Sequence, residues 1–137
     1  MNMTDYLVDT NHVSRILEGE QKLKSRLQET KSPEDTFGIL MTILGELYYA
    51  VYASQRKQEN LAGLKAFLHS VILWEYDRPA AEEFGRIQAE QKAKGKPIHA
   101  SDAQIAAVAR LHNLKVLSND RHFAFVSNLA IESWLSS

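Results

Sequence analysis

The chain has 137 residues, of which 45% are hydrophobic and 24% charged, and its formal net charge is −1. This length suits a single domain spanning residues 1–137 with a buried core, and the composition excludes a disordered chain. The absence of cysteine excludes disulfides, thiolate zinc sites and cysteine nucleophiles, and it agrees with a reducing compartment. A charge near zero removes net charge as an argument for nucleic-acid binding, although basic residues can still be segregated on one face.

Targeting and membrane signals are missing from the sequence. Met1 to Asp9 carry acidic residues and no long apolar stretch, so no signal peptide is visible. No segment approaches the roughly 20 apolar residues that a transmembrane helix needs. We therefore expect a cytoplasmic protein with no membrane contact.

Apolar runs alternate with amphipathic segments along the whole chain. Strands are predicted at residues 5–9, 36–40, 71–76, 114–118 and 129–134. Helices are predicted at 12–17, 21–30, 41–54, 58–69, 79–94 and 101–112, with a helical turn at 121–125. Thr10 and Asn11 are expected to cap the first helix and Ser101 the last long one, which Asn113 is placed to end. The alternation predicts an α/β fold in which a central, mostly parallel β-sheet is flanked by helices on both faces.

Four acidic residues lie inside or at the end of apolar segments: Asp9, Glu46, Asp102 and Asp120. A carboxylate in an apolar setting costs several kcal/mol unless a partner compensates it, and no run of Lys or Arg accompanies any of the four. In parallel α/β sheets, sites gather beyond the carboxyl ends of the strands. Asp9 and Asp120 follow two predicted strands, so the acids can converge at this edge.

Each acid also has an ordinary explanation. Asp9 and Asp120 can cap the helices that follow them, and the helix dipole tolerates Asp102 in a first turn. Glu46 lies in the middle of an apolar helix, where neither argument applies, although it can still point outwards. If the acids meet, two carboxylates about 4 Å apart repel by roughly 4 kcal/mol at an effective dielectric of about 20. Hard oxygen ligands then favour Mg²⁺ or Mn²⁺.

Five segments, in order, resemble PIN-domain proteins and in particular the VapC toxins of bacterial toxin–antitoxin pairs. They are YLVDTN (6–11), LGELYY (44–49), PIHASDAQIAAVA (97–109), LSNDRHF (117–123) and LAIESW (129–134). The resemblance implies an endoribonuclease dependent on Mg²⁺ or Mn²⁺, with Asp9, Glu46, Asp102 and Asp120 as its catalytic, metal-binding acids. It also assigns supporting roles to Thr10, Asn11 and Ser118. His12 departs from the pattern, since the family commonly has an aliphatic residue there.

The resemblance further implies an RNA substrate, a VapB-type antitoxin as partner and a homodimer. The helix carrying Tyr48, Tyr49 and Tyr52 is a candidate interface, although core packing explains it equally well. Phosphate contacts beyond the metal would fall to Lys92, Lys94, Lys96 and Arg121, where the ordinary explanation is a solvated helix face.

Two alternatives remain open from the sequence. A PIN-fold nuclease can process RNA without being a toxin. An acidic module can also bind a partner protein without any catalysis. A phosphatase-type nucleophilic aspartate is disfavoured, because it requires an acid two residues after Asp9 and that position is Asn11.

Overall fold

A computed structural model describes residues 4–17 and 35–133 of the chain, and it contains one five-stranded sheet. The strands are β1 (Asp5–Val8), β2 (Thr36–Leu40), β3 (Ile72–Trp74), β4 (Lys115–Leu117) and β5 (Ile131–Glu132). Their spatial order is β3-β2-β1-β4-β5, and every neighbouring pair is parallel. The helices are α1 (Thr10–Leu17), α3 (Met41–Tyr52), α4 (Lys57–Leu68), α5 (Arg78–Lys94), α6 (Ala100–His112) and the 3₁₀ helix η1 (Arg121–Phe125).

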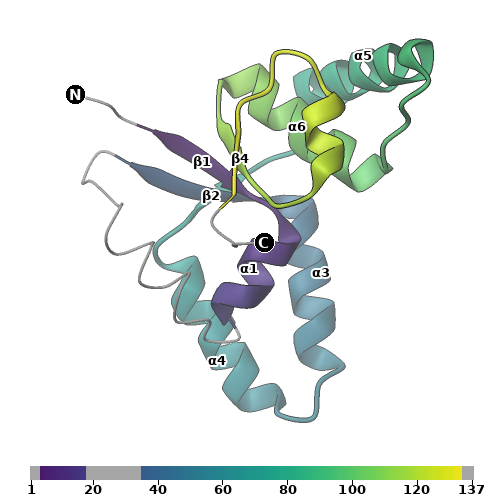
Figure 1. Ribbon diagram of the computed structural model, residues 1–137. Helices are drawn as coiled ribbons and strands as arrows, with labels where there is room; N and C mark the ends of the chain where they lie inside the picture. Colours follow the sequence, from purple (N-terminus) through teal and green to yellow (C-terminus); the bar gives the residue numbers. More distant parts are fainter. Residues whose placement is uncertain (1–3, 18–34, 134–137) are drawn as a thin grey trace.

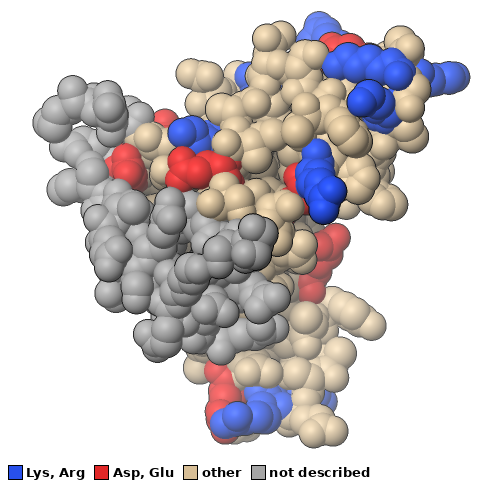
Figure 2. Space-filling model, in the orientation of Figure 1, with Lys and Arg blue, Asp and Glu red and all other residues tan. Residues whose placement is uncertain are grey.

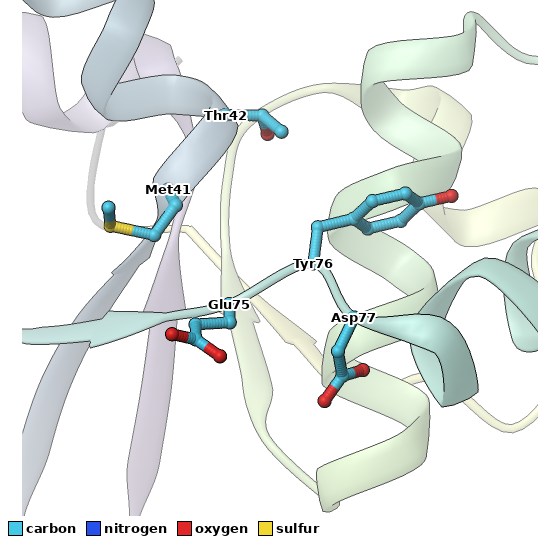
Figure 3. Close-up of a pocket in the computed structure, with 5 residues that line it drawn as sticks. All are labelled: Met41, Thr42, Glu75, Tyr76 and Asp77. Atoms are coloured by element: carbon cyan, nitrogen blue, oxygen red, sulfur yellow. The ribbon is translucent and has the colours of Figure 1, made fainter.

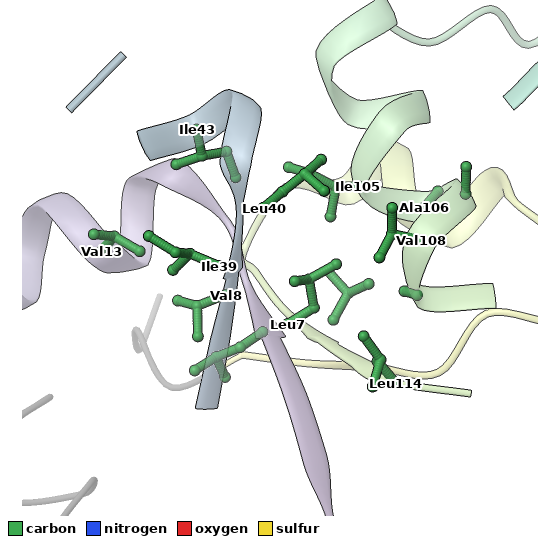
Figure 4. Packing of buried hydrophobic residues seen from close by; sticks show 14 of the residues in the cluster. Leu7, Val8, Val13, Ile39, Leu40, Ile43, Ile105, Ala106, Val108 and Leu114 are labelled. Carbon is green, nitrogen blue, oxygen red and sulfur yellow. The ribbon is translucent and has the colours of Figure 1, made fainter. Parts of the chain in front are cut away.

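Helices cover both faces of the sheet. Figure 1 shows α5 and α6 on one side of the strands and α1, α3 and α4 on the other. Successive side chains of a strand point to opposite faces, so a strand covered on both sides buries neighbouring residues equally. Leu7 and Val8 of β1 are 0% and 1% exposed. Figure 4 shows Val13 and Ile43 on one side of β1 and β2, and Ile105 and Val108 on the other. The predicted α/β fold is confirmed.

Two helix starts differ from the sequence prediction. Helix α1 begins at Thr10, and the Asp9 carboxylate accepts a hydrogen bond from the His12 N–H, so Asp9 caps this helix in place of Thr10 or Asn11. Helix α6 begins at Ala100, with His99 in the cap position that was predicted for Ser101. Its other end agrees with the prediction, because Asn113 has φ 58° and ends the helix in the left-handed conformation. The predicted helix at 21–30 lies outside the described residues.

Strand β3 is shorter than predicted. The sequence predicted a strand at 71–76. Strand β3 is the edge strand beside β2, and its Ile72 and Leu73 are 42% and 41% exposed. Its third residue, Trp74, lies against Gly38 of β2, where an added Cβ would stand 2.5 Å from the indole ring. A side chain at position 38 would therefore displace Trp74, and this close approach explains the glycine within β2.

Candidate active site

Three of the four predicted acids lie at the carboxyl edge of the sheet. The last residues of β1 and β4 are paired, Val8 with Leu117, so Asp9 and Ser118 emerge side by side. Helix α6 precedes β4 in the chain and runs antiparallel to it, which places its first turn, with Asp102, at the same edge. Asp120 follows Ser118 by two residues. The fold thus brings together acids that are as much as 111 positions apart in the sequence.

Asp9 is held firmly in place. Its N–H donates to the Leu117 carbonyl at 3.1 Å, which continues the pairing of β1 with β4. One carboxylate oxygen, Oδ1, accepts the N–H of His12 at 3.1 Å, and the other, Oδ2, accepts the Ser118 hydroxyl. The residue is 5% exposed. A buried carboxylate with both oxygens engaged is oriented rather than free to rotate.

Asp120 shares the same serine. Its N–H donates to Ser118 Oγ at 3.0 Å, so a single hydroxyl group connects Asp9 to the backbone of Asp120. Its Oδ1 accepts the His122 N–H at 2.9 Å, which caps η1, and lies 2.7 Å from His122 Nδ1. Burial raises the pKa of Asp120, but the hydrogen bonds and charge of His122, with a smaller contribution from the Asp102 side chain, hold that pKa below its usual value.

The pKa of Asp102, in contrast, is raised. Burial raises the pKa of Asp102 most, and the negative charges of Asp120 and Asp9 raise it further, against a smaller opposing influence of His99 and His122. A carboxylate becomes harder to ionise when like charges approach it. The three aspartates therefore lie within electrostatic reach of one another. Within the described part of the chain, no Lys or Arg forms an ion pair with any of them.

Glu46 differs from the sequence prediction. It lies on α3 but is exposed, because the buried face of this helix consists of Ile43, Leu44, Leu47 and Val51. Among the described residues, no hydrogen bond or ion pair joins it to the three aspartates. Thr10 is partly buried and Asn11 is exposed. As the side chains stand, no three acids or histidines in residues 4–17 and 35–133 are arranged to hold a metal ion.

The sequence reasoning missed the contact between His12 and Asp9. His12, which departs from the family pattern, is fully buried, and its Nδ1 lies 3.5 Å from Asp9 Oδ1. The spacing of Asp9 and His12 in the sequence could have predicted this contact. A residue three positions after a helix cap lies beside the capping carboxylate.

A hollow opens at the same edge of the sheet, between the start of α3 and the β3–α5 connection. Figure 3 shows its lining residues, Met41, Thr42, Glu75, Tyr76 and Asp77, and its volume is about 440 Å³. Asp77 caps α5 by accepting the Ala80 N–H at 3.1 Å, a cap that the sequence analysis also missed. None of the three aspartates lines this hollow, so it is not the site described above.

Comparison with known proteins identifies the family. The PIN domain matches residues 6–129. Ribonuclease VapC2 of Haemophilus influenzae is 32% identical over 135 residues, which are 97% of this chain and 100% of that protein. The chain belongs to the PIN-domain family of VapC ribonucleases. The tRNA(fMet)-specific endonuclease VapC of Shigella flexneri is 31% identical, over 96% of this chain and 99% of its own length.

Solved VapC structures have the same fold. A chain in the crystal structure of VapBC2 from Rickettsia felis, bound to a promoter DNA fragment, matches with a TM-score of 0.87 at 25% identity, over 96% of this chain and 99% of that one. A chain of DNA-bound VapBC from Salmonella typhimurium matches with a TM-score of 0.86 at 29% identity, over 97% and 100%. The resemblance to VapC proteins is thereby confirmed. Among the described residues, no helix has the length and apolar character to cross a membrane.

Proposed function

We propose that this ribonuclease uses Mg²⁺ or Mn²⁺ to hydrolyse RNA phosphodiester bonds at Asp9, Asp102 and Asp120, with Glu46 as a fourth, more peripheral acid. The observation that carries the proposal is the convergence of Asp9 and Asp120 on the Ser118 hydroxyl at the carboxyl edge of the sheet, and both of these aspartates also raise the pKa of Asp102. Carboxylates gathered without a Lys or Arg partner suit a hard cation, and their oxygens are the ligands that Mg²⁺ and Mn²⁺ prefer. The donor set therefore fits the metal.

The proposed roles of the residues differ. A divalent ion, when bound, lowers the pKa of a water molecule and stabilises the negative charge on the phosphate during in-line attack. Asp102 and Asp120 are the proposed ligands with the strongest mutual coupling. Ser118 and the His12 N–H fix the orientation of Asp9, and His122 does the same for Asp120. Supporting contacts of this kind orient metal ligands and adjust their basicity. Thr10 and Asn11 remain proposed supporting residues.

The proposed biological setting is a cytoplasmic toxin that is inhibited by a VapB-type antitoxin. Its support is the character of the matched structures, which are VapBC complexes from Rickettsia felis and Salmonella typhimurium. A homodimer belongs to the same proposal. Tyr49 and Tyr52 of α3 are 75% and 58% exposed, and Tyr52 stacks with Tyr48 at 6.0 Å, so α3 presents aromatic side chains suited to an interface.

A cleavage assay tests the function directly. The purified chain is expected to cut end-labelled RNA in Mn²⁺ or Mg²⁺, to lose this activity in excess EDTA and to regain it when Mn²⁺ is restored. Expression in cells should arrest growth, and co-expression of the antitoxin should relieve the arrest. Cleavage that persists undiminished in EDTA would contradict metal dependence. Absence of RNA cleavage in both metals would contradict the function itself.

Ser118 provides a second test of the proposed metal site. Removal of its hydroxyl in Ser118→Ala leaves the buried Asp9 Oδ2 and the Asp120 N–H without their shared partner. We expect Mn²⁺ affinity, measured by calorimetric titration, to fall by about 10- to 100-fold. Ser118→Thr keeps the hydroxyl and serves as the matched control. Equal Mn²⁺ affinity in the alanine and threonine variants would show that the hydroxyl does not orient the ligands.

A further inference from the structure

Beyond the three aspartates, a line of aromatic rings leads away from the site. His122, which contacts Asp120, lies 6.5 Å from the His99 ring and 5.7 Å from the Phe125 ring, measured between ring centroids. The ammonium group of Lys96 lies 4.6 Å from the centre of the Phe125 ring. His99, His122 and Lys96 are exposed and Phe125 is partly buried. We call these four residues, His99, His122, Phe125 and Lys96, the ring track.

The chain around the track fixes its geometry. The Lys96 N–H donates to the Gln91 carbonyl at 3.0 Å, and the buried Gln91 side-chain amide donates to the Lys96 carbonyl at 2.9 Å. These two hydrogen bonds fix Lys96 against the last turns of α5. On the other side, the Lys94 ammonium group donates to the Phe125 carbonyl at 3.2 Å and to Ser127 Oγ at 2.8 Å. The turn and η1 are therefore held against each other.

Positive charge lies at the far end of this track. Figure 2 shows Lys and Arg side chains gathered over the end of the molecule that α5 occupies in Figure 1. Single-stranded RNA is bound by proteins that offer ring faces for its bases and cations for its phosphates. The ring track combines both features and begins at a residue in contact with the proposed catalytic aspartates.

We infer that the ring track, His99, His122, Phe125 and Lys96, binds the single-stranded RNA segment that flanks the scissile phosphodiester on one side. This inference rests on the proposed ribonuclease function. Bases stack on the exposed rings of His99 and His122. Phe125 packs edge-on against His122 and holds the Lys96 ammonium group over its own face, where Lys96 neutralises a phosphate of the same strand. The track is continuous with the aspartates through the contact between His122 and Asp120, so RNA held there is delivered to the site.

The test measures binding of a fluorescently labelled single-stranded RNA by anisotropy, with EDTA present so that metal-dependent cleavage does not interfere. Phe125→Leu keeps an apolar side chain but removes the ring, and it is expected to weaken binding by about fivefold to 100-fold. Lys96→Gln is expected to reduce the slope of log affinity against log salt by about 0.7. Lys65→Gln is the matched control, because Lys65 is an exposed lysine on α4, and it should change neither quantity.

The outcomes separate this inference from the function on which it rests. If the wild-type chain cleaves RNA in Mn²⁺ but Phe125→Leu and Lys96→Gln bind RNA as Lys65→Gln does, the ring track is overturned and the ribonuclease stands. Loss of affinity for a protein partner with unchanged RNA binding overturns it as well. Should Phe125→Leu fail to fold, the exposed Lys96 still decides the matter through its salt slope. A wild-type chain that cleaves no RNA overturns the ribonuclease first.

Discussion

Asp102→Asn is expected to reduce RNA cleavage by about 10³-fold or more, while making the metal-free protein more stable. Loss of a metal ligand removes several kcal/mol of stabilisation from the transition state, and about 4 kcal/mol corresponds to about 10³-fold in rate. The free energy of unfolding changes in the opposite direction because the wild-type Asp102 is partly buried and lies near Asp120 and Asp9, and its desolvation and their negative charges raise its pKa. Asparagine has a similar shape and carries no charge, so burial and repulsion no longer oppose folding.

The pH dependence of the unfolding free energy tests whether the charge of Asp102 destabilises the metal-free fold. Because the folded-state pKa of Asp102 is raised, wild-type stability decreases as the pH rises from the usual aspartate pKa through the folded value. Asp102→Asn should lack this decrease, and it should also lose the rise in melting temperature that Mn²⁺ gives the wild type. Both are measured by thermal unfolding with and without Mn²⁺.

Asp77→Asn is the matched control for Asp102→Asn. Asp77 is an exposed aspartate at the same edge of the sheet, and asparagine caps a helix about as well as aspartate. Cleavage by this variant should equal that of the wild type.

Glu46→Gln should give an intermediate loss of RNA cleavage, since Glu46 is exposed and makes no hydrogen bond or ion pair with the aspartates among the described residues. If Asp102→Asn cleaves RNA as the wild type does, Asp102 is not part of the catalytic site and the nuclease site lies elsewhere in the chain.

Arg110→Met is expected to destabilise the fold by about 1.5–3 kcal/mol at neutral pH, the usual range for hydrogen bonds to charged groups. Arg110 lies on the side of α6 that faces α5, and its guanidinium donates to Glu83 at 2.5 Å, to Glu90 at 2.9 Å and to the Ser127 carbonyl at 3.2 Å. The Arg110 and Glu83 side chains are only 12% and 13% exposed. Methionine fills similar space but leaves both carboxylates without this cation.

Acid should abolish the difference between wild type and Arg110→Met. Burial raises the pKa of Glu83, but hydrogen bonds and charge from Arg110 and Arg86 lower it overall, and the hydrogen bond from Arg110 lowers the pKa of Glu90. Groups with lowered pKa stabilise the fold above their unfolded-state pKa, and this stability is lost as the pH falls through the folded value. Urea unfolding at several pH values should therefore show the two curves converging at low pH.

Arg86→Met provides the comparison for Arg110→Met. Arg86 also pairs with Glu83, at 2.8 Å, but its side chain is 57% exposed, and exposed pairs contribute little. Its loss should change the unfolding free energy much less than the loss of Arg110. Equal effects of the two substitutions would show that the position of Arg110 between α5 and α6 has no particular importance.

The acids illustrate how far a sequence can predict a site. Helix capping was the ordinary explanation for Asp9 and Asp120, and the structure contains both caps, at the His12 and His122 N–H groups. Capping and convergence are compatible here, because a residue that follows a strand and caps the next helix lies at the edge where sites form. The convergence with Asp102 depended on strand order, which periodicity alone does not provide.

Glu46 and strand β3 are more exposed than their apolar surroundings in the sequence indicate. The apolar helix around Glu46 left open whether this acid is buried or points outwards, and it is exposed, because α3 buries only the face carrying Ile43, Leu44, Leu47 and Val51. The apolar run at 71–76 predicted a strand but not its place in the sheet, and β3 forms the edge. The composition of a segment limits how much apolar surface it can bury, and the elements packed against it determine how much is buried.

The bond between Ser118 and Asp9 joins residues 109 positions apart. During synthesis, Asp9 leaves the ribosome long before the serine that orients it, and β1 must wait for β4 before their shared edge exists. A chain interrupted before residue 118 therefore contains the first acid of the site without its supporting hydroxyl or Asp120. On the proposed assignment of the site, a chain interrupted there is expected to lack nuclease activity.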